Sequence, residues 1–271
     1  MDNNNFEFVR EFLKKETAIV LDPTKEYLVE SRLTPLSKEL GFTSLDALIN
    51  SFKGNPSENI KLRMIDAMTI NETLFFRDIH PFEVLKNKIL PEIIAKKGEK
   101  KLEIWCAAAS SGQEPYTIAM IIKELETLLA GWVINIIGSD ISEKMLFRAK
   151  NGIYNQLEVN RGLPLPYLAK YFQKKGSEWQ ISQEIRDMVQ FQKINLMKPW
   201  TIPRMDLIFM RNVLIYFSVE TKKEIVQRVE NTLHPSGYLF LGGAETTMGI
   251  NDQFERAGID KVPCYQLKIK H

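Results

Sequence analysis

A chain of 271 residues, 44% apolar and 26% charged, has the length and composition of a globular protein with one large domain, or with a large and a small one. Its net charge of +2 gives no reason to expect a nucleic-acid partner. No apolar run reaches the roughly 18 residues of a membrane span, and the first residues lack the basic and apolar regions of a signal peptide. We therefore expect a cytoplasmic protein with no direct membrane insertion.

The first part of the chain has helical periodicity and no strand pattern. Its helices are expected to begin near Phe6, after Pro23-Thr24, at the N-cap Ser44 and after a break at residues 54–57, the last one running to about Met68. The sequence thus predicts a small all-helical domain over residues 1–70.

Residues 71–95 connect this domain to the rest of the chain, with a helix expected from Pro81 to about residue 95. The connection begins with a segment in which polar Asn71, Thr73 and Arg77 flank apolar residues. A segment of this kind can close over a cleft, or it can be a packed linker. The residues by themselves favour the packed linker.

Residues 96–271 alternate between strands and helices. Strands are expected at residues 102–106, 133–138, 206–210, 238–241 and 262–269, and helices at residues 115–129, 142–149 and 219–233. Such alternation is typical of βαβ units, so we predict an α/β domain with a mostly parallel sheet. Residues from about 155 to 200 interrupt the alternation. They are interpreted as a small β insertion with short strands at 179–182 and 188–194.

The stretch from residue 104 to 120 is expected to form a strand, a turn of small residues and the start of a helix. In α/β sheets this is where nucleotide-like cofactors bind. The turn holds Gly112 and Glu114 but no Lys or Arg, and it lacks a GxGxxG motif. A phosphate would favour a glycine-rich turn with a basic residue. An acidic turn suits a positively charged cofactor with ribose hydroxyls, and S-adenosylmethionine fits that description.

Polar residues also follow two other expected strands, at ends that should face the ligand crevice. Asp140 can accept hydrogen bonds from two ribose hydroxyls, or it can cap the helix that begins near Ser142. Arg211, Asn212 and Tyr216 follow the strand at 206–210 and can line the crevice. The alternative makes Arg211 a surface charge and Tyr216 a core ring.

Other reactive side chains give little sign of chemistry. Cys106 lies in an apolar run without a basic neighbour, which indicates an inert core thiol. His80, His234 and His271 are too few and too scattered to suggest a metal site or an obvious catalytic base. We therefore predict no metal.

Several motifs are informative when they are considered together. They are the segments 71–77 (NETLFFR), 110–120 (SSGQEPYTIAM), Asp140 with Gly152-Ile-Tyr154, Arg161-Gly-Leu-Pro164, Asn195-Leu196 and 209–217 (FMRNVLIYF). Their order and spacing resemble those of the bacterial chemotaxis receptor methyltransferases, the CheR family, over nearly the whole chain. The composite is specific, although no single motif is.

The resemblance implies methyl transfer from S-adenosyl-L-methionine to glutamate side chains of methyl-accepting chemotaxis receptors, with S-adenosyl-L-homocysteine as the product. It implies a Rossmann-like sheet of the class I methyltransferase type and a helical domain that contacts the receptor's signalling helices. The implied cofactor-binding residues are Asn71, Thr73, Arg77, Glu114, Asp140, Asn195, Leu196, Arg211 and Asn212. The implied catalytic residues, which hold or orient the glutamate, are Arg77 and Tyr216.

The sequence leaves some roles open. A glutamate has a pKa of about 4.3 and is ionised at neutral pH, so no general base is needed. Arg77 would hold either the substrate carboxylate or the carboxylate of the cofactor. Two other functions remain as alternatives: a non-catalytic module that binds the cofactor or its product, and a methyltransferase for small carboxylic acids. The separate helical domain and the β insertion favour a large substrate.

Overall fold

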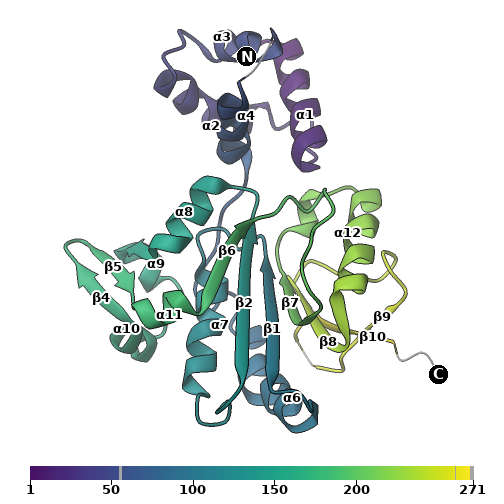
Figure 1. Ribbon diagram of the computed structural model, residues 1–271. Coiled ribbons are helices and arrows are strands. Elements are labelled where there is room, and N and C mark those ends of the chain that lie inside the picture. Colours follow the sequence, from purple (N-terminus) through teal and green to yellow (C-terminus); the bar gives the residue numbers. More distant parts are fainter. Residues whose placement is uncertain (55–56, 260, 269–271) are drawn as a thin grey trace.

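A helical domain, at the top of Figure 1, adjoins a larger domain built on a twisted sheet. The computed structural model describes residues 1–54, 57–259 and 261–268. Residues 55 and 56 of the expected break, and residue 269 of the last expected strand, lie outside the described residues. Within those ranges, no helix is long and apolar enough to cross a membrane.

The N-terminal domain is all-helical, as predicted. Its helices are α1 (Asn3–Thr17), α2 (Glu26–Glu39), α3 (Leu45–Gly54) and α4 (Glu58–Met68). The hydroxyl of Ser44 accepts a hydrogen bond from the N–H of Ala47 at 3.0 Å, which confirms the expected cap of α3. The apolar sides of the helices meet in one core, where Leu33 and Met64 have no exposed surface.

The helix expected from Pro81 to about residue 95 is present but interrupted. α5 (His80–Val84) passes into a π-helical turn (Leu85–Ile89), and α6 (Leu90–Lys96) follows. Pro91 has no N–H to donate to the preceding turn, and the wider π turn accommodates that break.

The larger domain contains a seven-stranded sheet with the order β6-β2-β1-β7-β8-β10-β9. Its strands are β1 (Lys101–Ala107), β2 (Val133–Asp140), β6 (Val189–Lys193), β7 (Met205–Met210), β8 (Leu233–Leu241), β9 (Phe254–Arg256) and β10 (Cys264–Leu267). The pairs from β6 to β8 are parallel, and β10 is antiparallel to both of its neighbours. This confirms the predicted Rossmann-like sheet. β9 was not expected, because three residues are too few to carry a periodic signal.

Helices cover both faces of the sheet, so its strands supply two hydrophobic cores. Alternate residues of β7 belong to different cores: Leu207 lies in one core and Ile208 in the other. α7 (Gln113–Glu124) packs into the first core and α12 (Val219–Thr232) into the second. Because neither face meets water, β7 is an unbroken run of apolar residues after Asp206.

The strand expected at residues 188–194 was wrongly placed in the β insertion. As β6, it pairs in parallel with β2 at the edge of the large sheet. Alternating apolar residues identify a strand but not its partner. The partner here is set by a long-range contact, since the ring of Phe191 lies against Gly138 of β2. The insertion has its own antiparallel sheet of β3 (Ile153–Asn155), β5 (Glu178–Ile181) and β4 (Phe172–Lys175).

The insertion packs against the linker. The ring of Phe75 lies edge-on to Tyr154, with ring centroids 4.9 Å apart, and edge-on to Phe172 at 5.5 Å. The hydroxyl of Tyr154 donates a hydrogen bond to the carbonyl of Ser111 at 2.8 Å. The insertion therefore braces the linker and the turn after β1, the two segments that carry several predicted site residues.

Gly162 lies where the insertion meets the linker, with a φ of +93°, and an added Cβ would lie 2.3 Å from the carbonyl oxygen of Phe75. We expect Gly162→Ala to lower the free energy of unfolding by more than the roughly 1–2 kcal/mol of left-handed backbone strain, because the linker must also move. Thermal unfolding measures this loss. Gly176→Ala is the matched control, since Gly176 has a φ of +60° but open space around it. Equal losses in the two variants would contradict the contact.

Candidate active site

A cleft of about 940 Å³, including the part open to solvent, lies where the helical domain and the linker meet the carboxyl ends of β1, β2, β6 and β7. The strand order reverses between β1 and β7, and α/β sheets bind ligands at such a point. Every residue predicted to bind cofactor or orient substrate lines this cleft: Asn71, Thr73, Arg77, Glu114, Asp140, Asn195, Leu196, Arg211, Asn212 and Tyr216.

The turn after β1 has a backbone that only small residues permit. Gly112 is the N-cap of α7 and has a φ of 92°. A Cβ there would lie 3.0 Å from Ala149 and 3.1 Å from both Phe191 and Tyr116. The backbone at Gly112 therefore packs directly against these three side chains. Its outer residues, Ala108 and Ser110, line the cleft.

The side chain of Asp140 accepts hydrogen bonds from two backbone segments, the turn after β1 and the segment after β2. One carboxylate oxygen accepts from the N–H of Ser110 at 2.8 Å, and the other accepts from the N–H of Ser142 at 2.9 Å. The cap of α8 (Glu143–Asn151) is Ser142, whose hydroxyl accepts a hydrogen bond from the N–H of Met145. Asp140 therefore supports the start of the helix without capping it, and it also lines the cleft. Burial raises the pKa of its carboxyl above the ordinary value, although the N–H groups oppose the shift.

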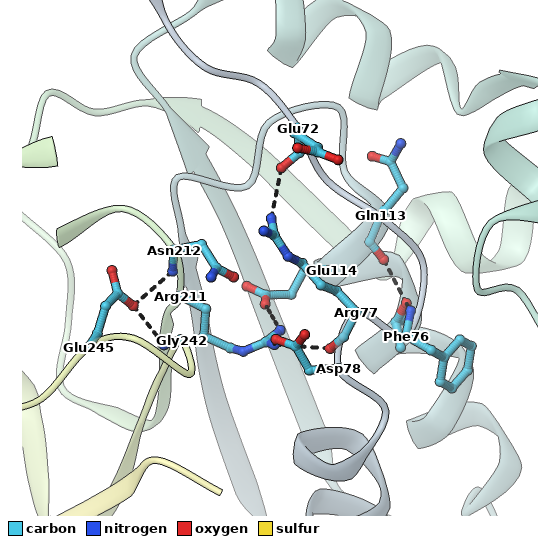
Figure 2. Close-up of polar contacts among 11 residues, drawn as sticks. Glu72, Phe76, Arg77, Asp78, Gln113, Glu114, Arg211, Asn212, Gly242 and Glu245 are labelled. Atoms are coloured by element: carbon cyan, nitrogen blue, oxygen red, sulfur yellow. Dashed lines mark hydrogen bonds and ion pairs between the residues drawn. The ribbon is translucent and has the colours of Figure 1, made fainter. Parts of the chain in front are cut away.

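Arg211 is the buried centre of a hydrogen-bond network with Glu114, Asp78 and the backbone of Arg77 (Figure 2). Its side chain is 2% exposed, which excludes the alternative of a surface charge. One terminal nitrogen donates to Glu114 at 2.8 Å, and the other donates to Asp78 at 2.6 Å and to the carbonyl of Arg77 at 2.9 Å. Burial raises the pKa of Glu114 above its usual range, and Arg211 opposes that rise. Within the described chain, the buried Nε–H of Arg211 has no hydrogen-bond partner.

Arg77 lies in a backbone segment of unusual conformation. Phe76, Asp78 and Ile79 all have φ between 50° and 68°, a left-handed region that costs free energy for residues other than glycine. The hydroxyl of Thr117 accepts a hydrogen bond from the N–H of Phe76 at 3.2 Å, and the guanidinium of Arg211 donates one to the carbonyl of Arg77. The guanidinium of Arg77 donates to the carbonyl of Glu72 at 2.9 Å and lines the cleft. The linker is therefore both packed and part of the site.

Tyr216 ends a short 3-10 turn (Leu214–Tyr216) after β7. It is partly exposed and lines the cleft, so the core-ring alternative is wrong. Burial raises the pKa of its phenol, with Arg77 and then Arg32 opposing the shift. The phenol is therefore protonated at neutral pH and able to donate a hydrogen bond.

The helical domain supplies one wall of the cleft, which the sequence did not predict. Thr17 and Ile19, at the end of α1, are among the lining residues. Asn195 joins the domains, because its side-chain amide donates to the carbonyl of Glu16 at 2.8 Å. A second contact joins the N–H of Val20 to the carbonyl of Tyr216 at 3.1 Å. These pairs are far apart in sequence and leave no local signal.

Two further carboxylates next to the cleft were missed. Asp78 follows the recognised linker motif directly, and its ion pair with Arg211 could have been suspected from that position. Glu245 follows β8, and the rule for carboxyl ends of strands points to it as well. Cys106 is fully buried, and burial raises its thiol pKa well above the ordinary value, as expected of a core thiol. Among the described residues, no group of His, Cys, Asp or Glu could hold a metal ion.

Comparison with known proteins identifies the family. Residues 71–262 match the CheR methyltransferase SAM binding domain, and residues 4–69 match the CheR methyltransferase all-alpha domain. The chain belongs to the CheR methyltransferase family. It is 42% identical over 271 residues to the chemotaxis protein methyltransferase Cher2 of Pseudomonas putida, and the match covers 98% of each chain. It is 43% identical over 258 residues to chemotaxis protein methyltransferase 1 of Pseudomonas aeruginosa, covering 93% of this chain and 94% of that protein.

Family membership establishes the type of reaction and the cofactor. The enzyme is a methyltransferase that uses S-adenosylmethionine, and both domains of the family are present in their usual order. The cleft lies between these two domains and is lined by residues of both.

Proposed function

We propose that this CheR methyltransferase methylates glutamate side chains in the cytoplasmic signalling helices of chemoreceptors, and that the cleft between its domains is the place of transfer. The observation that carries the proposal is the gathering of one buried and one largely buried carboxylate, an arginine and a partly exposed tyrosine in one cleft. Glu114 and Asp140 suit the cofactor, and Arg77 and Tyr216 suit a carboxylate substrate.

The residues of the cleft fit S-adenosylmethionine. The cleft is open to solvent on one side and is lined by both polar and apolar side chains, as a site for a nucleoside-like ligand requires. Asp140 offers acceptors for ribose hydroxyls. Glu114 is paired with Arg211, but the carboxylates of the lining outnumber its guanidinium groups by three to two, and this excess favours a sulfonium. The unpartnered Nε–H of Arg211 would meet an acceptor such as a ligand carboxylate. Asn71, Thr73, Asn195, Leu196 and Asn212 complete the proposed cofactor wall.

The protein's part in the reaction is orientation. S-adenosylmethionine, when bound, supplies the electrophilic methyl group. Arg77 binds the incoming glutamate carboxylate through a charge-assisted hydrogen bond, and Tyr216 donates a second one that directs an oxygen. The linker and the end of α1 exclude water from the cleft. Holding the reacting groups in line is worth on the order of 7–11 kcal/mol, and the ionised carboxylate needs no general base.

The test is methyl transfer to receptors. Membranes that contain chemoreceptors, incubated with the enzyme and methyl-labelled cofactor, are expected to gain label in the receptor that base releases as methanol, because a glutamate methyl ester is hydrolysed by base. Binding of the cofactor without any transfer would favour a non-catalytic module. Faster methylation of a small soluble carboxylic acid would favour a small-molecule methyltransferase.

Cofactor affinity should fall on acidification. Burial raises the pKa of both Asp140 and Glu114, so they take up protons at a higher pH than exposed carboxyls do. The ionised forms bind the cofactor, and protonation therefore competes with binding. Below the controlling pKa, the dissociation constant should rise up to about tenfold per pH unit for one group.

Calorimetric titration of S-adenosylmethionine between neutral and acidic pH measures this dependence. Asp140→Asn is the control, because it removes one of the two titrating groups. That variant should bind more weakly at neutral pH and lose affinity less steeply on acidification. An affinity that does not change with pH in the unaltered enzyme would remove both carboxylates from the cofactor site.

A further inference from the structure

The carboxylate of Glu245 is enclosed by backbone N–H groups from two loops. It follows β8 and is 7% exposed. Its Oε2 accepts from Gly242 at 2.6 Å and Asn212 at 2.8 Å, and its Oε1 accepts from Leu214 at 2.7 Å, Val213 at 2.9 Å and Ile215 at 3.3 Å. Figure 2 shows the side chain reaching the backbone of Asn212 and Gly242. One side chain thus ties the loop after β8 to the loop after β7.

The loop held in this way connects the residues proposed for cofactor and substrate. Arg211 and Asn212 precede it, and Tyr216 ends it. Asn212 has a φ of 58°, a left-handed conformation that needs outside support. The first N–H groups of a helical turn have no partner within the turn, and the carboxylate supplies one to each of them.

Gly242 makes the close approach feasible. A Cβ at this position would lie 2.8 Å from the backbone nitrogen of Asn212 and 2.8 Å from Oε2 of Glu245. Any larger residue would push the carboxylate away from the loop. The contact therefore depends on the glycine as well as on the glutamate.

We infer that Glu245 is a positioning residue for methyl transfer: its carboxylate fixes residues 212–215 and so sets the direction of the Tyr216 phenol in the cleft. Glu245 is not among the residues that line the cleft. Its carboxylate accepts charge-assisted hydrogen bonds from five N–H groups, and these bonds restrict the conformations that the loop can adopt. The inference rests on the proposed function, since it gives Tyr216 a role in orienting the substrate.

Glu245→Gln tests the inference with little change of shape. An amide nitrogen would replace one oxygen and face N–H donors, so the loop would lose about half of its acceptors. We expect kcat to fall on the order of 100-fold, the cost of a small misplacement of a reacting group. The dissociation constant of S-adenosylhomocysteine should rise by a smaller factor than kcat falls, because Asp140 and Glu114 are untouched and the altered loop contributes only Asn212 to the proposed cofactor wall. Glu255→Gln, which alters an exposed carboxylate on β9, is the control and should keep the original kcat.

A double-mutant cycle separates positioning from a general structural effect. Tyr216→Phe is measured in the original enzyme and in Glu245→Gln. If Glu245 acts through Tyr216, removal of the hydroxyl costs much less in the Glu245→Gln background, and the two losses do not multiply. Losses that multiply fully, or an unchanged kcat in Glu245→Gln, would overturn the inference.

Hydrogen exchange of the unaltered enzyme keeps the inference testable if Glu245→Gln does not fold. The N–H groups of Val213 and Leu214 should exchange slowly, and exchange at the rate of an open loop would overturn the inference. This measurement needs no methyl transfer. A failure of the proposed function, seen as absence of receptor methylation by the original enzyme, would therefore be distinguished from a failure of the loop contact.

Discussion

Replacement of Arg77 by alanine should lower methyl transfer to receptor glutamates by roughly 100- to 1,000-fold, the range seen when a single oriented donor is removed from an active site. The guanidinium of Arg77 lines the cleft and, among the residues that the structure describes, makes one hydrogen bond, to the carbonyl of Glu72. Its loss therefore removes the proposed substrate contact and little of the packing. The thermal midpoint should stay within a few degrees of the original value, because surface substitutions cost about 0.5 kcal/mol or less.

Single-turnover transfer of labelled methyl groups measures this effect. Arg161→Ala is a matched control, because Arg161 pairs with the side chain of the same Glu72 at 3.2 Å but is 59% exposed. Arg77→Lys should be intermediate, since a lysine keeps the charge but not the two-pronged geometry. Normal transfer by Arg77→Ala, or an equal loss in Arg161→Ala, would refute the role of Arg77.

Replacement of Arg211 by leucine should damage both folding and cofactor binding. The guanidinium partners Glu114 and Asp78 and holds the carbonyl of Arg77. Without it, the carboxylate of Glu114 would be buried and unpaired, which costs about 3–5 kcal/mol. In a chain of this length such a loss lowers the thermal midpoint by roughly 10 °C. The linker would also lose the contact that fixes Arg77 in the cleft.

A second substitution identifies the origin of that loss. Glu114→Gln in the Arg211→Leu background removes the unpaired charge, so it should recover part of the stability and none of the methyl transfer. Differential scanning calorimetry of the single and double variants makes the comparison. A stability of Arg211→Leu equal to that of the original enzyme would mean that the network contributes nothing to the fold.

The site was largely predictable because its residues follow strands. Asp140, Arg211 and Asn212 stand where apolar strands end, and parallel strands bring such ends to one edge of the sheet. Glu114 was found from the chemistry of its turn. The resemblance to the CheR family added the linker residues, for which the local pattern alone favoured a packed segment. Structure adds that Arg77 is both packed by its backbone and directed into the cleft by its side chain.

Long-range contacts could not be predicted from the sequence. The place of β6 in the large sheet depends on pairing with β2, which periodicity does not encode. The wall supplied by Thr17 and Ile19 depends on how two domains dock. The burial of Arg211 follows from partners in the linker and in α7. In each case the contacts that determine the structure join residues that are far apart in the sequence and become neighbours only in the fold.

The central claim is that one cleft binds the cofactor and presents its methyl group to a glutamate. A crystal structure of the enzyme with S-adenosylhomocysteine tests it most directly. The ribose hydroxyls are expected within hydrogen-bond distance of Asp140, with the sulfur facing the space between Arg77 and Tyr216. A ligand bound outside this cleft, or bound with its sulfur turned away from both side chains, would contradict the account.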